Sequence, residues 1–190
     1  MACPICNKEK KIFTIKVKDY EYDLKFEALY SQCKSCKSIY RSNPSKIKKW
    51  RKKIYPKKKY LPLKGNIIYD LLKGIYSKYE IKKIAEVLDK NFFKKQSTIL
   101  DIACGKGYLI RNLSKNKNFK CFGTDINIST TKKDNVNFIK SSYDNINLIK
   151  KINPDLIIIN NFLEHVENLI NIGKIIHQIK KDSYLIIITP

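Results

Sequence analysis

The run from Thr98 to Leu113 constrains the fold of this chain more than any other feature of its sequence. A short apolar segment leads into a turn that contains Gly105 and Gly107, and apolar residues at helical spacing follow. Glycine is needed where a backbone turns sharply and approaches a ligand closely. The run therefore predicts a strand, a glycine turn and a helix beside a ligand-binding site.

Further apolar segments follow at regular intervals and predict more strands, over residues 119–125, 136–140, 155–160 and 184–189. The segment 155–160 is a continuous Leu-Ile-Ile-Ile run, which is typical of a strand buried on both faces. A helical pattern from about residue 168 to 181 precedes the last of them. Strands that alternate with helices predict an α/β fold with a doubly wound parallel sheet.

Two cofactor classes compete for the glycine turn. The dinucleotide fingerprint is G-x-G-x-x-G/A, and Gly105 and Gly107 fit its first two positions. The third position is Ile110, where that fingerprint needs a small residue. Asp125, about 20 residues further on, suits either class. The two glycines alone therefore leave the cofactor open.

A longer pattern carries a family resemblance. Asp101-Ile102-Ala103-Cys104-Gly105-Lys106-Gly107 resembles the D-x-x-x-G-x-G signature of class I S-adenosylmethionine-dependent methyltransferases. Leu163-Glu164-His165-Val166, just after the fourth expected strand, resembles the L-E-H-V that many members carry there. The resemblance covers roughly residues 97–190 and implies a Rossmann-like methyltransferase fold with S-adenosylmethionine as the cofactor.

The resemblance also implies roles for single residues. Gly105 and Gly107 would let the backbone touch the methionine portion of the cofactor. Asp101 would hold the loop and help to bind the amino group, and Asp125 would accept hydrogen bonds from both ribose hydroxyls. The full set of expected cofactor-binding residues is Asp101, Ala103, Gly105, Gly107, Asp125, Ile126, Ser142, Tyr143, Asn160 and Asn161. Many members have an acidic residue near Ser142, so the chain departs from the family pattern there.

The candidates for catalysis are few. The sulfonium methyl is already an electrophile, so the enzyme has to align a nucleophile and, for some substrates, remove a proton. His165 and Glu164 follow the fourth expected strand, near the expected reaction centre. His177 lies among apolar residues of a helical pattern, which favours a structural role.

The chain also departs from the family at its end. The family has seven strands, and this sequence ends at Pro190, directly after the fifth expected strand. We therefore expect a truncated domain that keeps the cofactor half of the site and lacks much of the substrate half. Residues 126–135, between the second and third strands, are too few for the helix that the family usually has there.

Four of the six cysteines form two CxxC pairs, Cys3 with Cys6 and Cys33 with Cys36. Two such pairs are the ligand set of a structural zinc site, because each places two thiolates on one tight turn. Alternating apolar residues over 13–17 and 20–26 predict two antiparallel strands between the pairs. Cys104 and Cys121 have no such partners, and we expect them to be buried as small apolar residues.

These features predict a zinc-ribbon-like module over residues 1–42, a basic connector and helical lead-in over 43–96, and a partial methyltransferase domain over 97–190. Residues 41–64 are rich in lysine and contain no acidic residue, as in an exposed linker. From about residue 66 to 95, apolar residues at helical spacing predict two amphipathic helices.

The net charge of +22 raises nucleic acid as a partner. We do not favour it, because all but three of the basic residues are lysine, whereas nucleic-acid binders rely on arginine for bidentate contacts. The sequence contains no run of 18 apolar residues, so we predict no membrane span. The N-terminus has no signal-peptide pattern. We therefore expect a cytoplasmic protein.

Three functions remain open. A zinc module followed by this fold resembles bacterial methyltransferases of polysaccharide or deoxysugar pathways, which implies a small-molecule or sugar-linked substrate. The same order resembles, more loosely, zinc-bearing ribosomal RNA methyltransferases. The third hypothesis is a non-catalytic protein that retains the cofactor-binding fold.

Overall fold

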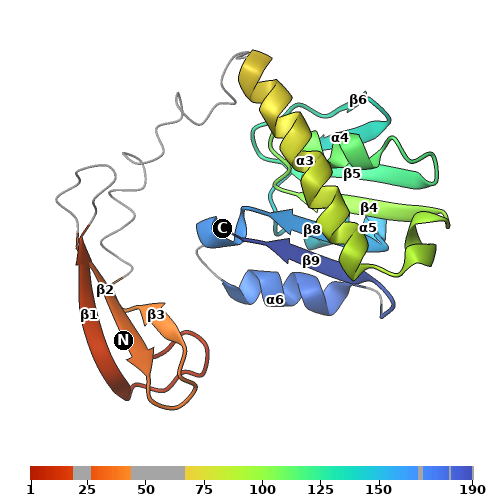
Figure 1. Ribbon diagram of the computed structural model, residues 1–190. Coiled ribbons are helices and arrows are strands. Elements are labelled where there is room, and N and C mark those ends of the chain that lie inside the picture. The colour runs from red at the N-terminus through yellow and green to blue at the C-terminus, as the bar shows by residue number, and fades with distance from the viewer. Residues whose placement is uncertain (19–26, 44–66, 167–168, 180, 190) are drawn as a thin grey trace. The chain divides into compact units, whose positions relative to one another are not determined.

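The protein is described by a computed structural model that covers residues 1–18, 27–43, 67–166, 169–179 and 181–189, without the side chains of residues 169 and 170. The chain separates into two compact units, Met1–Leu61 and Pro62–Pro190. The two are considered separately below, and Figure 1 labels their elements.

The first unit contains a small antiparallel sheet in the order β1-β2-β3. Its strands are β1 (Lys11–Lys18), β2 (Glu27–Cys33) and β3 (Ile39–Arg41). The strand predicted over 13–17 lies within β1, whereas the alternating pattern over 20–26 lies outside the described residues. Cys3, Cys33 and Tyr40 form the only buried apolar cluster of this unit's described part. So small a core provides little stability of its own.

The second unit is built on a six-stranded sheet in the order β6-β7-β5-β4-β8-β9. Its strands are β4 (Ser97–Ile102), β5 (Phe119–Asp125), β6 (Thr131–Lys133), β7 (Val136–Lys140), β8 (Leu156–Asn160) and β9 (Tyr184–Ile188). All neighbouring strands pair in parallel except β6, which runs antiparallel to β7. The predicted α/β fold with a parallel sheet is therefore confirmed.

Helices cover both faces of this sheet (Figure 1). They are α3 (Ile67–Val87), η2 (Lys90–Phe93), α4 (Tyr108–Leu113), α5 (Ile146–Ile152), η3 (Leu163–His165) and α6 (Leu169–Gln178). On one face, α3, η2 and α4 pack around Ile99 and Ile158. On the other face, α5 and α6 pack around Leu100 and Ile157. Alternate residues of β4 and β8 thus serve opposite faces, and both strands are buried on both sides.

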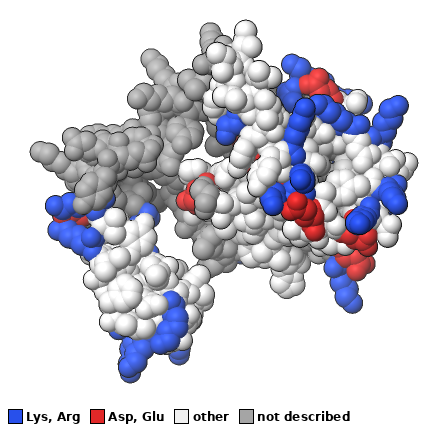
Figure 2. Space-filling model, viewed as in Figure 1, with Lys and Arg blue, Asp and Glu red and all other residues white. Residues whose placement is uncertain are grey.

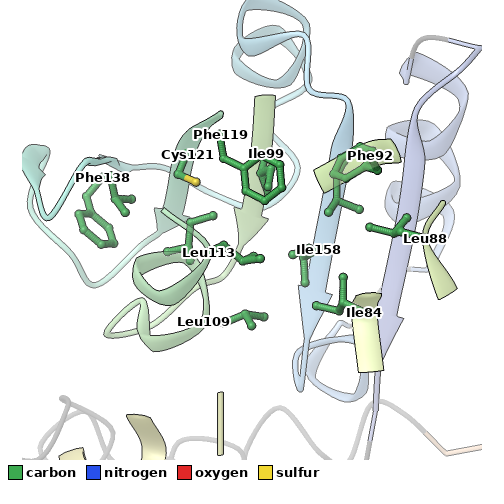
Figure 3. Packing of buried hydrophobic residues seen from close by; sticks show 13 residues of the cluster. Ile84, Leu88, Phe92, Ile99, Leu109, Leu113, Phe119, Cys121, Phe138 and Ile158 are labelled. Carbon is green, nitrogen blue, oxygen red and sulfur yellow. The ribbon is translucent and has the colours of Figure 1, made fainter. Parts of the chain in front are cut away.

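Figure 3 shows the core on the first of these faces. Ile84 of α3 approaches Ile158 of β8, and Leu88, the residue after the end of α3, packs in the same core, while Leu109 and Leu113 of α4 approach the β4 and β5 side of the sheet. Ile158 is fully buried, and burial of such a side chain contributes about 1.5–3 kcal/mol. This packing holds the carboxyl ends of the central strands in place between α3 and α4.

One detail differs from the sequence-based expectations. The two helices expected between residues 66 and 95 are one continuous helix, α3, followed by the short turn η2. Gly74 is the only glycine within α3 and the helix contains no proline, so nothing in its sequence forces a break. The residues between β5 and β7 form no helix, as their small number predicted, and contain the short strand β6. None of the described helices combines the length and the apolar composition that crossing a membrane requires.

The buried side of α3 also differs from the apolar pattern of its sequence. Ile68, Leu71 and Leu72 are more than half exposed. The buried line instead consists of Ser77, Glu80 and Ile84, three and four residues apart. A carboxylate thus occupies a position where a helix packed on a sheet normally places an apolar side chain.

Candidate functional site

Three central strands change from apolar to polar residues on the α3 side of the sheet as they reach their carboxyl ends. In β4, Ile99 is followed two residues later by Asp101, and in β8, Ile158 is followed two residues later by Asn160. In β5 the face ends at Asp125. Asp101 pairs in register with Ile158 on one side and with residue 123 of β5 on the other. Asp101, Asp125 and Asn160 therefore lie on the same face of the sheet, at the edge formed by the carboxyl ends of the strands.

Asp101 is buried without a full set of hydrogen-bond partners. The residue is 2% exposed, and its Oδ1 atom accepts no hydrogen bond from any described residue. Burial, with the nearby charges of Glu80 and Asp125, raises the pKa of Asp101 to about 8. A buried oxygen without a donor is costly, so the arrangement favours a ligand that brings a donor or a positive charge.

Glu80 reaches the same region from α3. It is 6% exposed, and its Oε1 atom accepts a hydrogen bond of 2.8 Å from Asn160 Nδ2. Burial raises the pKa of Glu80, although the Asn160 hydrogen bond and the charge of Lys73 oppose that shift. Asn160 Oδ1 is buried and has no partner among the described residues. The sequence-based reasoning missed Glu80, because only the packing of α3 on the sheet shows that this carboxylate lies on the buried line Ser77–Glu80–Ile84.

The glycine loop between β4 and α4 is tied to the end of β5. The backbone N–H of Gly105 donates to Asp125 Oδ2 at 3.1 Å, and that of Asn127 donates to Oδ1 at 2.7 Å. The backbone N–H of Cys104 donates to the carbonyl oxygen of Thr124 at 2.9 Å. Each carboxylate oxygen of Asp125 keeps a second lone pair, so Asp125 can still accept bonds from a ligand.

Three residues of this loop adopt left-handed backbone conformations, with φ values of 58° at Ala103, 54° at Gly105 and 73° at Gly107. A Cβ at Gly107 would lie 2.6 Å from a ring carbon of Phe138, so only glycine fits. A Cβ at Gly105 would meet nothing within 4 Å. Gly107 is therefore required by packing, whereas the space over Gly105 is open.

Side chains of α3 and α4 brace the same loop. Asp70 accepts hydrogen bonds from Lys106 Nζ at 2.9 Å and from the Tyr108 hydroxyl. These two bonds lower the pKa of Asp70. From α4, Arg111 Nε donates to the carbonyl oxygen of Lys106 at 3.2 Å, and the same guanidinium forms an ion pair with Asp134. The loop is thus held by both helices before any ligand binds.

The remaining expected cofactor residues lie at the carboxyl ends of β5, β7 and β8. Ile126 is 61% exposed directly after β5. Ser142 donates a hydrogen bond to Asp144, and the ring of Tyr143 packs on that of Phe162 with 5.2 Å between centroids. Asn161 has a φ of 47° and donates its backbone N–H to the carbonyl oxygen of Ile188.

The two expected catalytic residues lie in η3, immediately after β8. His165 Nε2 and Glu164 Oε1 are 3.8 Å apart, and about a third of each side chain is exposed. Phe162 lies between Tyr143 and His165, with 6.5 Å between the Phe162 and His165 ring centroids. Both groups thus belong to the edge of the sheet that carries Asn160, and both remain accessible to a substrate.

A second site lies in the first unit. The Sγ atoms of Cys3, Cys6, Cys33 and Cys36 all lie within 4.8 Å of one another. Two of the separations are 3.6 Å, between Cys3 and Cys36, and 3.5 Å, between Cys6 and Cys33. Four thiolates about 2.3 Å from one zinc ion stand about 3.8 Å apart at the corners of a tetrahedron. The four cysteines therefore have the spacing that a tetrahedral metal ion needs.

The two CxxC turns repeat one backbone conformation. In each, the residue after the second cysteine is left-handed, with φ values of 56° at Asn7 and 62° at Lys37. Its N–H donates to the carbonyl oxygen of the first cysteine of its turn, Cys3 or Cys33. Hydrogen bonding by the Ser38 side chain and backbone lowers the pKa of Cys36 to about 6. Such turns present thiolates side by side, an arrangement that a bound cation stabilises.

Among solved structures, two methyltransferases are similar to part of this chain. The MycE methyltransferase of the mycinamycin biosynthetic pathway, solved with Mg and SAH, has a TM-score of 0.43 and 11% identity over 65% of this chain. The plantazolicin methyltransferase BpumL, solved with a pentazolic desmethylPZN analog and SAH, has a TM-score of 0.37 and 19% identity over 77% of this chain. The matches span 34% and 53% of those two proteins. No curated protein sequence matches the chain.

A family model settles the classification of the second unit. The model described as "Methyltransferase domain" matches residues 76–190, which is more than half of the chain. The match includes Glu80, the glycine loop, Asp125 and the segment around His165. The chain therefore belongs to the methyltransferase domain family.

Proposed function

We propose that this protein is an S-adenosylmethionine-dependent methyltransferase that acts on a small-molecule or sugar-linked substrate. Membership of the methyltransferase domain family supports the activity. The observation that carries the cofactor assignment is the edge formed by Asp101, Asp125 and Asn160 beside a pre-formed glycine loop. In open α/β sheets, ligands bind at the carboxyl ends of the strands, where this edge lies.

The polar groups of the edge fit this cofactor. Asp101 Oδ1 and Asn160 Oδ1 are buried acceptors to which no described residue donates, and the cofactor's methionine portion carries an ammonium group that donates. Asp125 would accept from the ribose hydroxyls, and the exposed Ile126 would contact the adenine beside Ser142 and Tyr143. A carboxylate at this position suits a ribose with free hydroxyls and would repel a phosphate.

The packing of α4 argues against a dinucleotide. Ile110 occupies the third position of the dinucleotide fingerprint, and it is fully buried between α4 and the sheet. Its Cγ2 atom lies 3.3 Å from where a Cβ at Gly107 would be. The dinucleotide fingerprint needs a small residue at this position so that helix and strand can approach closely. Here a branched side chain fills that space.

When bound, the cofactor supplies an electrophilic methyl group. The chain's own contribution is to bind and orient the reactants, because alignment of a nucleophile accounts for much of such a rate enhancement. Ala103, Gly105 and Gly107 would hold the methionine portion against the loop backbone, with Asn161 beside it. His165, with Glu164 next to it, would take the proton of the acceptor or contact the substrate.

For the first unit we propose a structural zinc ion held by Cys3, Cys6, Cys33 and Cys36. The four thiols complete a tetrahedron and leave no open position for a substrate, so the metal stabilises the module rather than acting in catalysis. We also propose that this module corresponds to residues 1–42, followed by a basic connector and helical lead-in over 43–96, whose helix α3 packs on the sheet, and a partial methyltransferase domain over 97–190.

The described charges do not favour RNA as the substrate. On the face of the protein in Figure 2, the Lys and Arg side chains of the described residues are interspersed with Asp and Glu. A nucleic-acid track is instead a continuous positive stripe on one face. The face in view shows no such stripe among the described residues.

Removal of the Asp125 carboxylate tests the cofactor assignment. We expect Asp125→Ala to weaken S-adenosylmethionine binding at least tenfold, because a hydrogen bond to a charged group contributes about 1.5–3 kcal/mol and 1.4 kcal/mol is one decade. Titration calorimetry of the wild type and the variant measures this. Asp182→Ala, which removes an exposed carboxylate in the turn before β9, is the matched control and should bind like the wild type. Equal S-adenosylmethionine affinity in all three proteins would show that Asp125 does not bind the cofactor.

A further inference from the structure

Glu80 and Asp101 place two carboxyl groups in one buried region, at 6% and 2% exposure. Each group's charge is unfavourable to the other, and neither forms an ion pair within 4.0 Å with a described cation. Two buried carboxylates are stable together only with a proton or a cation between them. The region therefore favours a ligand group that is positively charged or that donates several hydrogen bonds.

The hydrogen-bonding atoms around the two carboxyl groups indicate the kind of ligand group that would bind there. Within the described part of the chain, Asp101 Oδ1 and Asn160 Oδ1 are both buried acceptors without donors, while the Nδ2 of Asn160 donates to Glu80. The site therefore offers acceptors from three elements, α3, β4 and β8, and little donor capacity. A primary ammonium has three donors and no acceptor, which matches this set. A metal ion fits less well, because the four cysteines are the only group of three or more metal-ligating side chains among the described residues that lie close enough to share an ion.

We propose that Glu80, together with Asp101 and Asn160, binds the α-ammonium group of the cofactor's methionine portion. The proposal rests on the function proposed above and adds a residue of α3 to the cofactor site. It also gives a reason for the buried line of α3, in which a carboxylate lies between Ser77 and the apolar Ile84. The helix thereby contributes a charge to the site as well as covering the sheet.

The proposal has a consequence for the pH dependence of binding. The charged and titratable groups around Asp101 are Glu80 from α3, Asp125 and Cys121 from β5, and Cys104 from the loop; Lys73 of α3 acts on Glu80. With its pKa at about 8, Asp101 holds a proton at neutral pH, and the ammonium displaces that proton into the solvent. Affinity should therefore rise with pH towards 8, then fall at higher pH, where the ammonium itself loses its proton.

The test compares two ligands and two variants of the full chain between about pH 6 and 9. S-adenosylhomocysteine carries the amino-acid portion, and methylthioadenosine carries the same adenosine without it. At its pH of tightest binding, Glu80→Gln should bind S-adenosylhomocysteine at least about tenfold more weakly than the wild type and methylthioadenosine equally well. The rising limb of the pH profile should also move to lower pH, because removal of the Glu80 charge lowers the pKa of Asp101. Glu86→Gln, on the exposed side of α3, should change neither result.

Each other outcome has a definite meaning. Equal affinity of Glu80→Gln and the wild type for S-adenosylhomocysteine overturns the proposal, and so does an equal loss for both ligands, which indicates a structural role. A thermal melt reports whether the variant folds. If it does not, the wild type decides, because its S-adenosylhomocysteine affinity must rise towards pH 8 while its methylthioadenosine affinity does not. A wild type that binds neither ligand contradicts the proposed function itself.

Discussion

Replacement of Cys33 and Cys36 by serine is expected to remove the metal from the protein and to unfold its first unit. The wild type should contain about one equivalent of zinc, and the double variant none, because a two-cysteine remnant cannot complete a tetrahedral site. The expected effect is large, since structural zinc contributes about 10–16 kcal/mol in small modules. The buried apolar cluster of Cys3, Cys33 and Tyr40 cannot replace that contribution.

Metal analysis of the purified proteins measures the zinc content, and hydrogen exchange over residues 1–43 measures the loss of β1–β3. A double variant at Cys104 and Cys121 is the matched control, because it removes two thiols that lie outside the cluster. It should retain the metal. Retention of zinc by the Cys33/Cys36 variant would show that the ligand assignment is wrong.

Substitution of the two loop glycines should separate ligand binding from folding. Gly105→Val should abolish S-adenosylmethionine binding, because the branched side chain would project into the open space where the methionine portion is proposed to lie. The left-handed φ of 54° adds a strain of about 1–2 kcal/mol, so the variant should remain folded but be less stable.

Gly107→Ala provides the contrast within the same loop. Its Cβ would lie 2.6 Å from the ring of Phe138, which is only 4% exposed and has no space to move into. Together with the strain at a φ of 73°, this overpacking should lower the free energy of unfolding by about 2–5 kcal/mol. Denaturant unfolding and calorimetric titration of both variants test the pair. A Gly105→Val protein that still binds the cofactor contradicts the proposed position of the methionine portion.

The sequence predicted the two central strands of the second unit, β4 and β8, well because their residues are buried on both faces, whereas the short, exposed strand β6 was not predicted. The continuous apolar run of β8 and the glycine turn after β4 each admit few alternatives. The prediction was wrong for residues 66–95, because periodicity alone cannot tell which apolar residues of a helix find a partner. Ile68 and Leu71 fit the helical pattern and are exposed, whereas Glu80 breaks the pattern and is buried.

The candidate site followed from the sequence only where a motif carried it. The short signature contains Asp101, Gly105 and Gly107, and Asp125 follows it at the spacing that the motif predicts. Glu80 comes from a helix that precedes the signature, and only the packing of α3 on the sheet brings it to Asn160. Likewise, the hydrogen bond from the Gly105 amide to Asp125 depends on the register of β4 with β5, which a single sequence does not specify.

Titration of the full wild-type chain with S-adenosylmethionine and with NAD tests the central claim most directly. The edge formed by Asp101, Asp125 and Asn160 and the branched Ile110 beside Gly107 lead us to expect saturable binding of S-adenosylmethionine at one site per chain. NAD should show no detectable binding. Saturable binding of NAD, with none of S-adenosylmethionine, would contradict the account.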